Sequence, residues 1–469
     1  MATELAALPD DVLAGILRRL PLHSLAAAML VCKAWHAVVN AQAHALLAPG
    51  DVRGIFINYV DHDRAHLFSR PTASPATVVD GLLGFLPDDL TRDYWSVLDH
   101  CNGLLLCQVR WKKDLCVCNP VTRRWTLLPG NSKEGGSLHA GAYLAFDPAV
   151  SPHYEVVLVP VVPEKPPKTE EERLRFCIGE LPDYHKDDGV VDPSNDTGLM
   201  EWPPKVWNVN VFSSRTGRWE ERVFVRDGEP AGTVKDMWMD PARPTWFGPR
   251  RRYAVYMGGA LYVHCRGHFI ARISLSDSKY RVIKLPVKVI EHAKPYLGRS
   301  EKGVYFGIVG DECQIQVSIL TESCGNVEWA LKYKDNLWYL AKYIRSYKNG
   351  KPFGGPWTVE RDSTEIDDNA ERKRLEWDSD HDDIWAPKIK DEEYGWEHLE
   401  ILGFHPYKEV IYLASPFTVA TYHLNSSNAQ YLGNSRPDGY YHGPSNGIYE
   451  SFVYTPSMIG ELHGGSTAK

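Results

Sequence analysis

The feature that most constrains this chain of 469 residues is a recurring pair of strands. Each copy has an apolar strand, a short polar turn and a second strand with aromatic or apolar residues. Such runs between turn residues are typical of antiparallel β-structure. The five copies are DLCVCNPVTRRWTLLP (114–129), VWNVNVFSSRTGRWEERVF (206–224), HFIARISLSDSKYRVIKLP (268–286), CQIQVSILTESCGNVEWALKY (313–333) and FTVATYHLNSSNAQYLGN (417–434).

A second element precedes each pair, a Gly or Pro turn with an apolar strand. Together with the pair it predicts an antiparallel meander of three or four strands. Five meanders result, with room for one more around residues 51–98. The preceding elements are CNGLLLCQV (101–109), YLAFDPAVSPHYEVVLVP (143–160), GGALYVHCRG (258–267), KGVYFGIVGD (302–311) and GFHPYKEVIYLAS (403–415).

Meanders at a period of roughly 45–60 residues, none able to bury both its faces alone, predict a β-propeller over residues 51–465. The last strand, YESFVYTPSMIGEL (449–462), is expected to close the ring against the first unit. The same alternation leaves a pair of β-sandwiches as the alternative. Two polar, charge-rich stretches, 163–200 and 350–398, are expected to be mobile insertions.

The chain begins differently, with the apolar segment LPDDVLAGILRRLPLHSLAAAMLVCKAWHAVV (8–39). Its apolar residues recur at helical spacing, so we expect three short helices within residues 1–47. About 40 residues cannot bury all these side chains against each other, and persistent apolar patches usually mark interfaces. On composition alone, the alternative that the segment simply packs on the following domain is slightly favoured. The expected fold is therefore α+β and multidomain: a small helical domain followed by a mainly antiparallel all-β domain.

Charge is unevenly distributed along the chain. The net charge is −8, but residues 360–400 hold 16 Asp and Glu against 6 Lys and Arg, which leaves +2 for all other residues. Bulk charge therefore does not indicate a nucleic-acid partner. Nine irregularly spaced cysteines with no signal-like leader indicate reduced thiols in the cytoplasm or nucleus. No stretch approaches the roughly 20 apolar residues of a membrane span.

No residue pattern indicates catalysis, a cofactor or a metal ion. His100 and Cys101 are neighbours on a predicted strand and so point to opposite faces. Cys116 and Cys118 share one face, which predicts two buried side chains rather than a zinc site. The acidic run EWDSDHDD (376–383) lacks the Gly and terminal Glu of a calcium loop.

Tryptophans are frequent between residues 202 and 246. Trp219 falls at the repeated core position of its unit, so we expect it to be buried. Three others lie near Pro-rich turns and are the candidates for exposed aromatics on a recognition surface. These are Trp202, Trp238 and Trp246.

The N-terminal string resembles an F-box over about 32 residues, with two Leu-Pro pairs and the later Val-Cys-Lys and Trp in register. The resemblance implies binding of the Skp-type adaptor of SCF ubiquitin ligases and, through it, of a cullin. The adaptor-binding residues that it implies are Leu8, Pro9, Val12, Leu13, Ile16, Leu20, Pro21, Leu25, Val31, Cys32, Lys33 and Trp35.

The remainder resembles the F-box-associated, kelch-like propeller of plant F-box proteins. HCNGLLLC (100–107), CNPVTRRWTLLP (118–129) and FDP (146–148) followed by YEVVLV (154–159) carry this resemblance. It implies a domain that recruits protein substrates, with no shared motif for the substrate site.

Two function classes follow from these patterns. The first is a non-enzymatic substrate receptor of an SCF-type ubiquitin ligase, or an F-box protein that works with the adaptor outside ubiquitination. The second is an enzyme or glycan-binding propeller in which residues 1–47 only cap the barrel. The absence of a catalytic constellation favours the first class.

Overall fold

The computed structural model describes most of the β-rich part of the chain and seven residues before it. The described part is mostly β, with few helices. It comprises residues 12, 13, 16, 28, 31, 35, 38, 52–70, 79–110, 114–130, 139–163, 196–240, 252–287, 293–300, 302–323, 326–346, 355–360, 398–440, 447–457 and 462.

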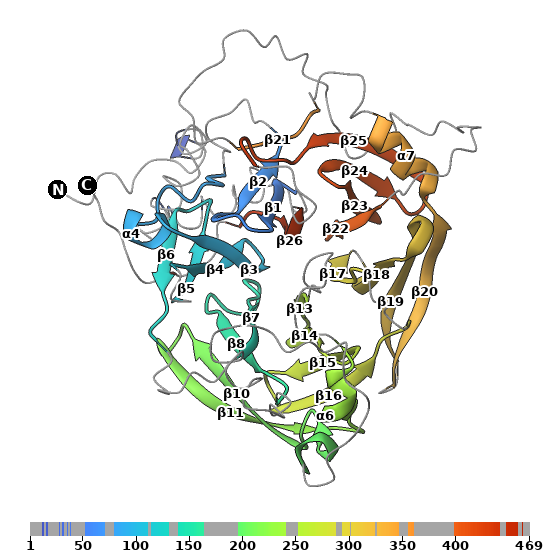
Figure 1. Ribbon diagram of the computed structural model, residues 1–469. Helices are drawn as coiled ribbons and strands as arrows, with labels where there is room; N and C mark the ends of the chain where they lie inside the picture. Colours follow the sequence, from blue (N-terminus) through green and yellow to red (C-terminus); the bar gives the residue numbers. More distant parts are fainter. Residues whose placement is uncertain are drawn as a thin grey trace, which may run out of the picture.

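Six four-stranded antiparallel units surround a common centre (Figure 1). Five of them are meanders of strands that are consecutive or nearly so in sequence, as the strand–turn–strand repeat predicts. Two of these five follow the N-terminal part of the β-rich body. They are β3 (Trp95–Cys101), β4 (Leu104–Val109), β5 (Asp114–Asn119), β6 (Arg124–Leu127), and β7 (His139–Ala145), β8 (Glu155–Pro160), β10 (Val206–Ser213), β11 (Arg218–Arg226).

The other three meanders follow in chain order around the centre. They are β13 (Ala254–Met257), β14 (Ala260–Cys265), β15 (Phe269–Ser274), β16 (Lys279–Lys284); β17 (Tyr296–Ser300), β18 (Gly303–Val309), β19 (Gln314–Ser323), β20 (Asn326–Asn336); and β22 (Glu400–Phe404), β23 (Val410–Ser415), β24 (Thr418–His423), β25 (Asn428–Asn434).

The remaining unit joins three distant parts of the sequence. Its strands, from the centre outward, are β26 (Ile448–Tyr454), β1 (Gly54–Tyr59), β2 (His66–Ser69) and β21 (Thr358–Val359). β26 pairs with β1 in antiparallel register from Gly54 opposite Tyr454 to Tyr59 opposite Ile448. The last strand thus closes the structure against the first, as the sequence predicts.

The innermost strands contact one another in an unbroken circuit, β26–β3–β7–β13–β17–β22 and back to β26. Two neighbouring units are also joined at their outer edges, because β11 and β16 pair in parallel through two residues each. This pairing merges the two meanders into one eight-stranded sheet.

Inner strands of the units, such as β14, β18 and β23, are buried on both faces, which explains the continuous apolar runs. In β4, Leu104 and Leu106 pack into a cluster shared with β7 and β8, whereas Leu105 and Cys107 belong to a different buried cluster. Successive side chains on a strand point to opposite faces, so a run such as LLLC requires apolar neighbours on both sides. Packing between neighbouring units therefore buries the apolar side chains on both faces of β4.

Tight turns hold the hairpins in register. Asn102 and Gly103 connect β3 to β4 with φ values of 46° and 88°, and Gly258 and Gly259 connect β13 to β14 with 59° and 77°. Two consecutive positive φ values define the turn that matches the twist of paired strands, and Asn and Gly tolerate them best. Both Gly-containing turns occur where the sequence predicts strand connections.

The β-rich body also contains short helices and two-residue strands outside the six units. A capping box, in which Thr233 and Asp236 bond reciprocally, starts α6. These elements are α4 (Asp88–Thr91), η4 (Asp196–Leu199), β9 (Glu201–Trp202), β12 (Gly232–Thr233), α6 (Val234–Trp238), η5 (Asp311–Cys313) and α7 (Trp338–Ser346).

Most of the two expected insertions lies outside the described residues. Within the second, however, β21 pairs with β2 as the outer strand of the closing unit, and neighbouring Trp357 is only 1% exposed. Within the first, residues 196–199 form η4. At these positions the two stretches thus contain regular elements, β21 and η4.

Candidate functional site

The described residues of the N-terminal segment separate into a buried and an exposed set. Val12 and Ile16 are helical, four residues apart, and 46% and 47% exposed. Residues at this spacing share one helix face. Leu13, between them, is 3% exposed. The face of this helix that carries Leu13 thus packs within the chain, whereas the face that carries Val12 and Ile16 exposes apolar side chains.

The second half of the segment shows the same division. Ala28 is buried, Trp35 and Val38 are half-buried against the cluster that contains it, and Val31 is 63% exposed. Of the adaptor-binding residues expected from the sequence, Leu13 and Trp35 therefore have packing partners in their own chain, whereas Val12, Ile16 and Val31 present apolar surface. The others lie outside the described residues: Leu8, Pro9, Leu20, Pro21, Leu25, Cys32 and Lys33.

A second candidate site is a cavity of about 70 Å³ at the centre of the ring. Residues of β3, β13, β17, β22 and β26 line it, so five of the six units contribute. Its side chains combine aromatic rings with a few polar groups, a composition common to ligand pockets. The polar and charged members are Asp99, His100, Cys101, Asn102, Arg299 and Thr455.

Two tyrosines hold β26 in place beside this cavity. The rings of Tyr253 and Tyr296 lie 4.0 Å apart between centroids. The Tyr296 hydroxyl donates to the Ser451 carbonyl (3.0 Å), and the Ser451 amide donates to the Tyr253 hydroxyl (3.2 Å). Both hydroxyls therefore satisfy backbone groups of β26, which would otherwise be buried at the centre without a partner.

The polar groups of β3 are held in their uncharged forms. Burial raises the pKa of Asp99 to about 8, although its Oδ2 accepts a hydrogen bond from the Leu144 amide (2.7 Å). Burial likewise lowers the pKa of His100, a half-buried residue that borders the cavity, to about 4. At neutral pH, Asp99 is mostly protonated and His100 is neutral.

Cys101 is equally unsuited to nucleophilic chemistry. Burial raises its pKa to about 12, and its thiol donates to the Phe146 carbonyl at 3.1 Å. The His100 and Cys101 pair thus lies on one strand without the low thiol pKa that a catalytic cysteine needs. Cys116 and Cys118 are fully buried free thiols, as predicted.

Arg299 is the one cavity-lining residue, among those described, that carries a formal charge at neutral pH. It lies on β17 and is exposed, unlike the other residues of that strand. Its guanidinium carbon stands 5.8 Å from the centroid of the Tyr407 ring, which is itself 40% exposed. A cation over an aromatic face is attracted by the ring quadrupole. The cavity mouth is therefore weakly positive.

The sequence did not single out Arg299, Tyr407 or Asp99. Arg299 lies in YLGRS, a short strand whose other residues are buried. A single cation in an otherwise buried innermost strand is the sequence feature that could have indicated this site. Recognising it required knowing which strand of each meander faces the centre, and the spacing of strands does not reveal this.

The aromatic candidates for a recognition surface behave differently from expectation. Trp202 is 8% exposed and packs edge-on against Trp207, so it is a core residue and not an exposed loop aromatic. Trp238 is half-buried and donates from Nε1 to the Pro163 carbonyl (2.8 Å). Trp219 is half-buried against Phe212. Trp246 lies outside the described residues.

Asp99 makes the stability of the protein depend on pH in a defined direction. An unfolded aspartate titrates near pH 4, whereas folded Asp99 holds its proton to about pH 8. Between these values the folded state binds the extra proton, so stability falls as pH rises. Between pH 7 and pH 8, the free energy of unfolding should fall by about 1 kcal/mol more in the unchanged chain than in the Asp99→Asn variant. Unfolding in denaturant at the two pH values measures this difference. Parallel pH profiles would contradict this assignment.

Within the described residues, no three His, Cys, Asp or Glu side chains are grouped closely enough to hold a metal ion. The described helices also include none that is long and apolar enough to cross a membrane.

Comparisons with known proteins identify the N-terminal segment. A family model described as F-box-like matches residues 5–43. F-box protein At5g07610 of Arabidopsis thaliana is 24% identical over 354 residues, which cover 71% of each chain. F-box protein At5g49610 of the same plant is 32% identical over 128 residues, 26% of this chain and 33% of the other.

Solved structures add little. A prolyl endopeptidase covers 88% of this chain and 56% of its own, at 11% identity and a TM-score of 0.31, which is too low to support any conclusion about fold or activity. The relatives by sequence are more informative, and they agree with the resemblance of residues 8–39 to an F-box. The chain thus carries an F-box-like domain near its N-terminus and is similar to plant F-box proteins, which supports its being one of them.

Proposed function

We propose that this chain is the substrate-recognition subunit of an SCF-type (Skp–cullin–F-box) ubiquitin ligase. In this proposal the N-terminal segment binds the Skp-type adaptor and, through it, the cullin, while the β-rich body binds a target protein. The observation that carries the proposal is the F-box-like match over residues 5–43. The half-exposed Val12 and Ile16 support it, since they offer apolar surface to a second polypeptide.

We infer further that the β-rich body is a six-bladed, kelch-like β-propeller. Its four-stranded units, the circuit of innermost strands and the β1–β26 pairing support this over paired β-sandwiches. A sandwich packs two sheets face to face, whereas here neighbouring units are arranged around one centre (Figure 1).

F-box proteins are generally substrate adaptors and not enzymes, and this proposal assigns no bond chemistry to the chain. Its contribution to ubiquitination is proximity: it holds target lysines near the ubiquitin-loaded enzyme and raises their effective concentration. Action in the cytoplasm, the nucleus or both is part of the same proposal.

Co-purification tests the proposal directly. The full chain and a variant lacking residues 1–47 are each expressed with an epitope tag, and the Skp-type adaptor and cullin are measured in the purified material. We expect both partners with the full chain and neither with the shortened one, while the β-rich body stays folded. Adaptor without cullin would indicate a role outside ubiquitination. Unfolding of the shortened chain would instead favour a helical cap on an enzyme or glycan-binding propeller.

A further inference from the structure

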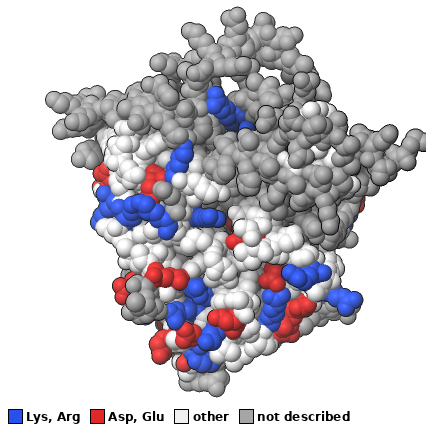
Figure 2. All heavy atoms as spheres, turned by 180° about the vertical axis from the view of Figure 1, so that it is seen from behind, with Lys and Arg blue, Asp and Glu red and all other residues white. Residues whose placement is uncertain are grey.

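Positively charged side chains lie on the β17–β20 unit, from Arg299 at the central cavity on β17 to Lys332 and Lys334 on the outer strand β20. We call this set the cationic surface and define it by Arg299, Lys302, Lys332 and Lys334. Arg299, Lys302 and Lys334 are exposed, and Lys332 is 27% exposed at its side chain. Figure 2 shows Lys and Arg side chains side by side near its left edge, the side of β19 and β20 in Figure 1.

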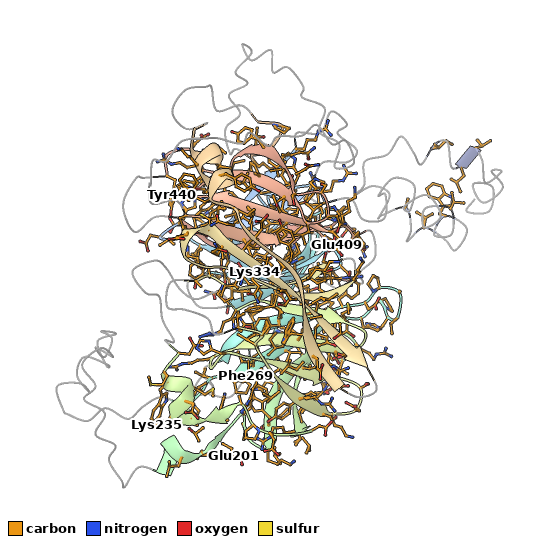
Figure 3. All side chains as sticks on the ribbon, turned by 90° about the vertical axis from the view of Figure 1, so that its right-hand side faces the viewer. Glu201, Lys235, Phe269, Lys334, Glu409 and Tyr440 are labelled. Carbon is orange, nitrogen blue, oxygen red and sulfur yellow. The ribbon has the colours of Figure 1, made fainter. Side chains whose placement is uncertain are left out.

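One buried carboxylate, that of Glu409, lies between two of these lysines. Glu409 follows β22, is 3% exposed at its side chain, and accepts a hydrogen bond from the Tyr305 hydroxyl (2.7 Å). Lys302 Nζ and Lys332 Nζ lie 3.8 and 3.9 Å from its two oxygens. Glu409 and Lys334 are labelled in Figure 3 on adjacent units. Two ammonium groups thus share one carboxylate, so an excess of positive charge remains.

The Arg299 guanidinium adds to this excess. In the described part of the chain it contacts the Tyr407 ring and has no ion pair. Tyr407 and Glu409 belong to the same connection between β22 and β23, so one loop contacts both Arg299 and the lysine pair. Two carboxylates accompany the four cations, Glu409 and Asp335, which follows Lys334 and accepts a hydrogen bond from the Tyr333 hydroxyl (2.9 Å), so an excess of +2 remains.

We propose that the cationic surface binds an acidic segment of a protein target, one carboxylate of which enters the central cavity beside Arg299. The inference rests on the proposed function as a substrate receptor and names the chemical class of the substrate. A cavity of about 70 Å³ accommodates a group the size of a side-chain carboxylate. With Asp99 held protonated, no anion on the lining opposes it.

A polypeptide fits this surface better than a nucleic acid. Nucleic-acid sites spread many cations along a backbone, and their aromatic side chains stack bases. Here Arg299 lines a small cavity, the three lysines lie farther out on the same unit, and the exposed ring of Tyr407 is already covered by Arg299. The charge outside residues 360–400 is only +2, so no larger basic field supports nucleic-acid binding.

Fluorescence anisotropy with labelled peptides tests this proposal on the full chain in complex with its adaptor. The probes are two amidated dodecapeptides, four repeats of Gly-Ser-Glu and four of Gly-Ser-Gln. We expect the Glu peptide to bind at least tenfold more tightly and to weaken steeply with added salt. Arg299→Gln and the double variant Lys332→Gln, Lys334→Gln should each weaken it at least fivefold.

A matched control separates this surface from charge in general. Lys235 is exposed on α6, far from Lys334 in Figure 3. Lys235→Gln removes the same charge and should leave the affinity for the Glu peptide within twofold of the unchanged chain. Thermal unfolding of each variant excludes loss of fold as the cause of weaker binding.

Three results would overturn the inference: equal affinity for the Glu and Gln peptides, equal loss of affinity in the Lys235 and Arg299 variants, or tighter binding of a twelve-nucleotide oligo-dT than of the Glu peptide. The last would assign the surface to nucleic acid. Adaptor capture is measured on the same preparations. If the adaptor fails to bind while the Glu peptide still binds through Arg299, the proposed function fails and the acidic-ligand site stands.

Discussion

Tyr454→Ala is expected to destabilise the β-rich body by about 4 kcal/mol. Tyr454 is fully buried at the end of β26, with its ring 5.4 Å from that of Phe56 on β1 in an edge-to-face arrangement. Its hydroxyl donates to the Gly103 carbonyl (3.1 Å) in the β3–β4 turn. The side chain therefore joins the last strand to the first and to the next unit, and its removal leaves a cavity at this junction.

Equilibrium unfolding in denaturant, followed by tryptophan fluorescence, measures the loss. Tyr454→Phe is the matched control, because it keeps the ring and removes only the hydrogen bond, for an expected cost of about 1 kcal/mol. An alanine variant as stable as the phenylalanine variant would show that closure between β1 and β26 does not depend on this ring.

Ile16→Asp is expected to weaken adaptor binding at least 30-fold, equivalent to about 2 kcal/mol. Ile16 is 47% exposed on the same helix face as Val12, while Leu13 is buried on the other. A carboxylate at this position would have to be desolvated in an apolar interface. The combined variant Leu8→Ala, Pro9→Ala, Ile16→Ala should have an effect at least as large.

Val150→Asp serves as the control for this experiment. Val150 is 82% exposed in the connection between β7 and β8, so it introduces the same charge in place of an exposed aliphatic residue elsewhere. Binding constants are measured by titration of purified adaptor against each variant. If Ile16→Asp and Val150→Asp bind the adaptor equally well, the N-terminal helix face is not the interface.

The strands were predictable because local chemistry specifies them. In DLCVCNPVTRRWTLLP, two runs rich in apolar residues flank a turn that contains Pro, Thr and Arg, and the structure places β5 and β6 on either side of it. The same holds for the pair around SSRTGRW, with β10 and β11. Turn residues and strand residues are set by backbone preferences that act within a few positions.

The site was less predictable because it depends on which residues converge at the centre. Trp202 and Arg299 illustrate this. Trp202 stands beside a Pro-rich turn, where exposure is a reasonable expectation, yet it packs against Trp207 within the core. Arg299 stands in an apolar strand, where burial would be expected, yet it is exposed at the cavity mouth. In both cases, contacts with residues distant in sequence determine whether the side chain is buried or exposed.

By itself the sequence determined the mostly β character, the strand pairs and the F-box-like start, because hydrophobic periodicity, turn chemistry and a specific string act locally. Only the tertiary structure decided that β21 completes the unit formed by β1, β2 and β26, that Trp357 is buried, and that Arg299 lies at the cavity mouth. The physical reason is that apolar burial and charge pairing depend on which surfaces meet in space, and a strand carries no local mark of the unit it will join.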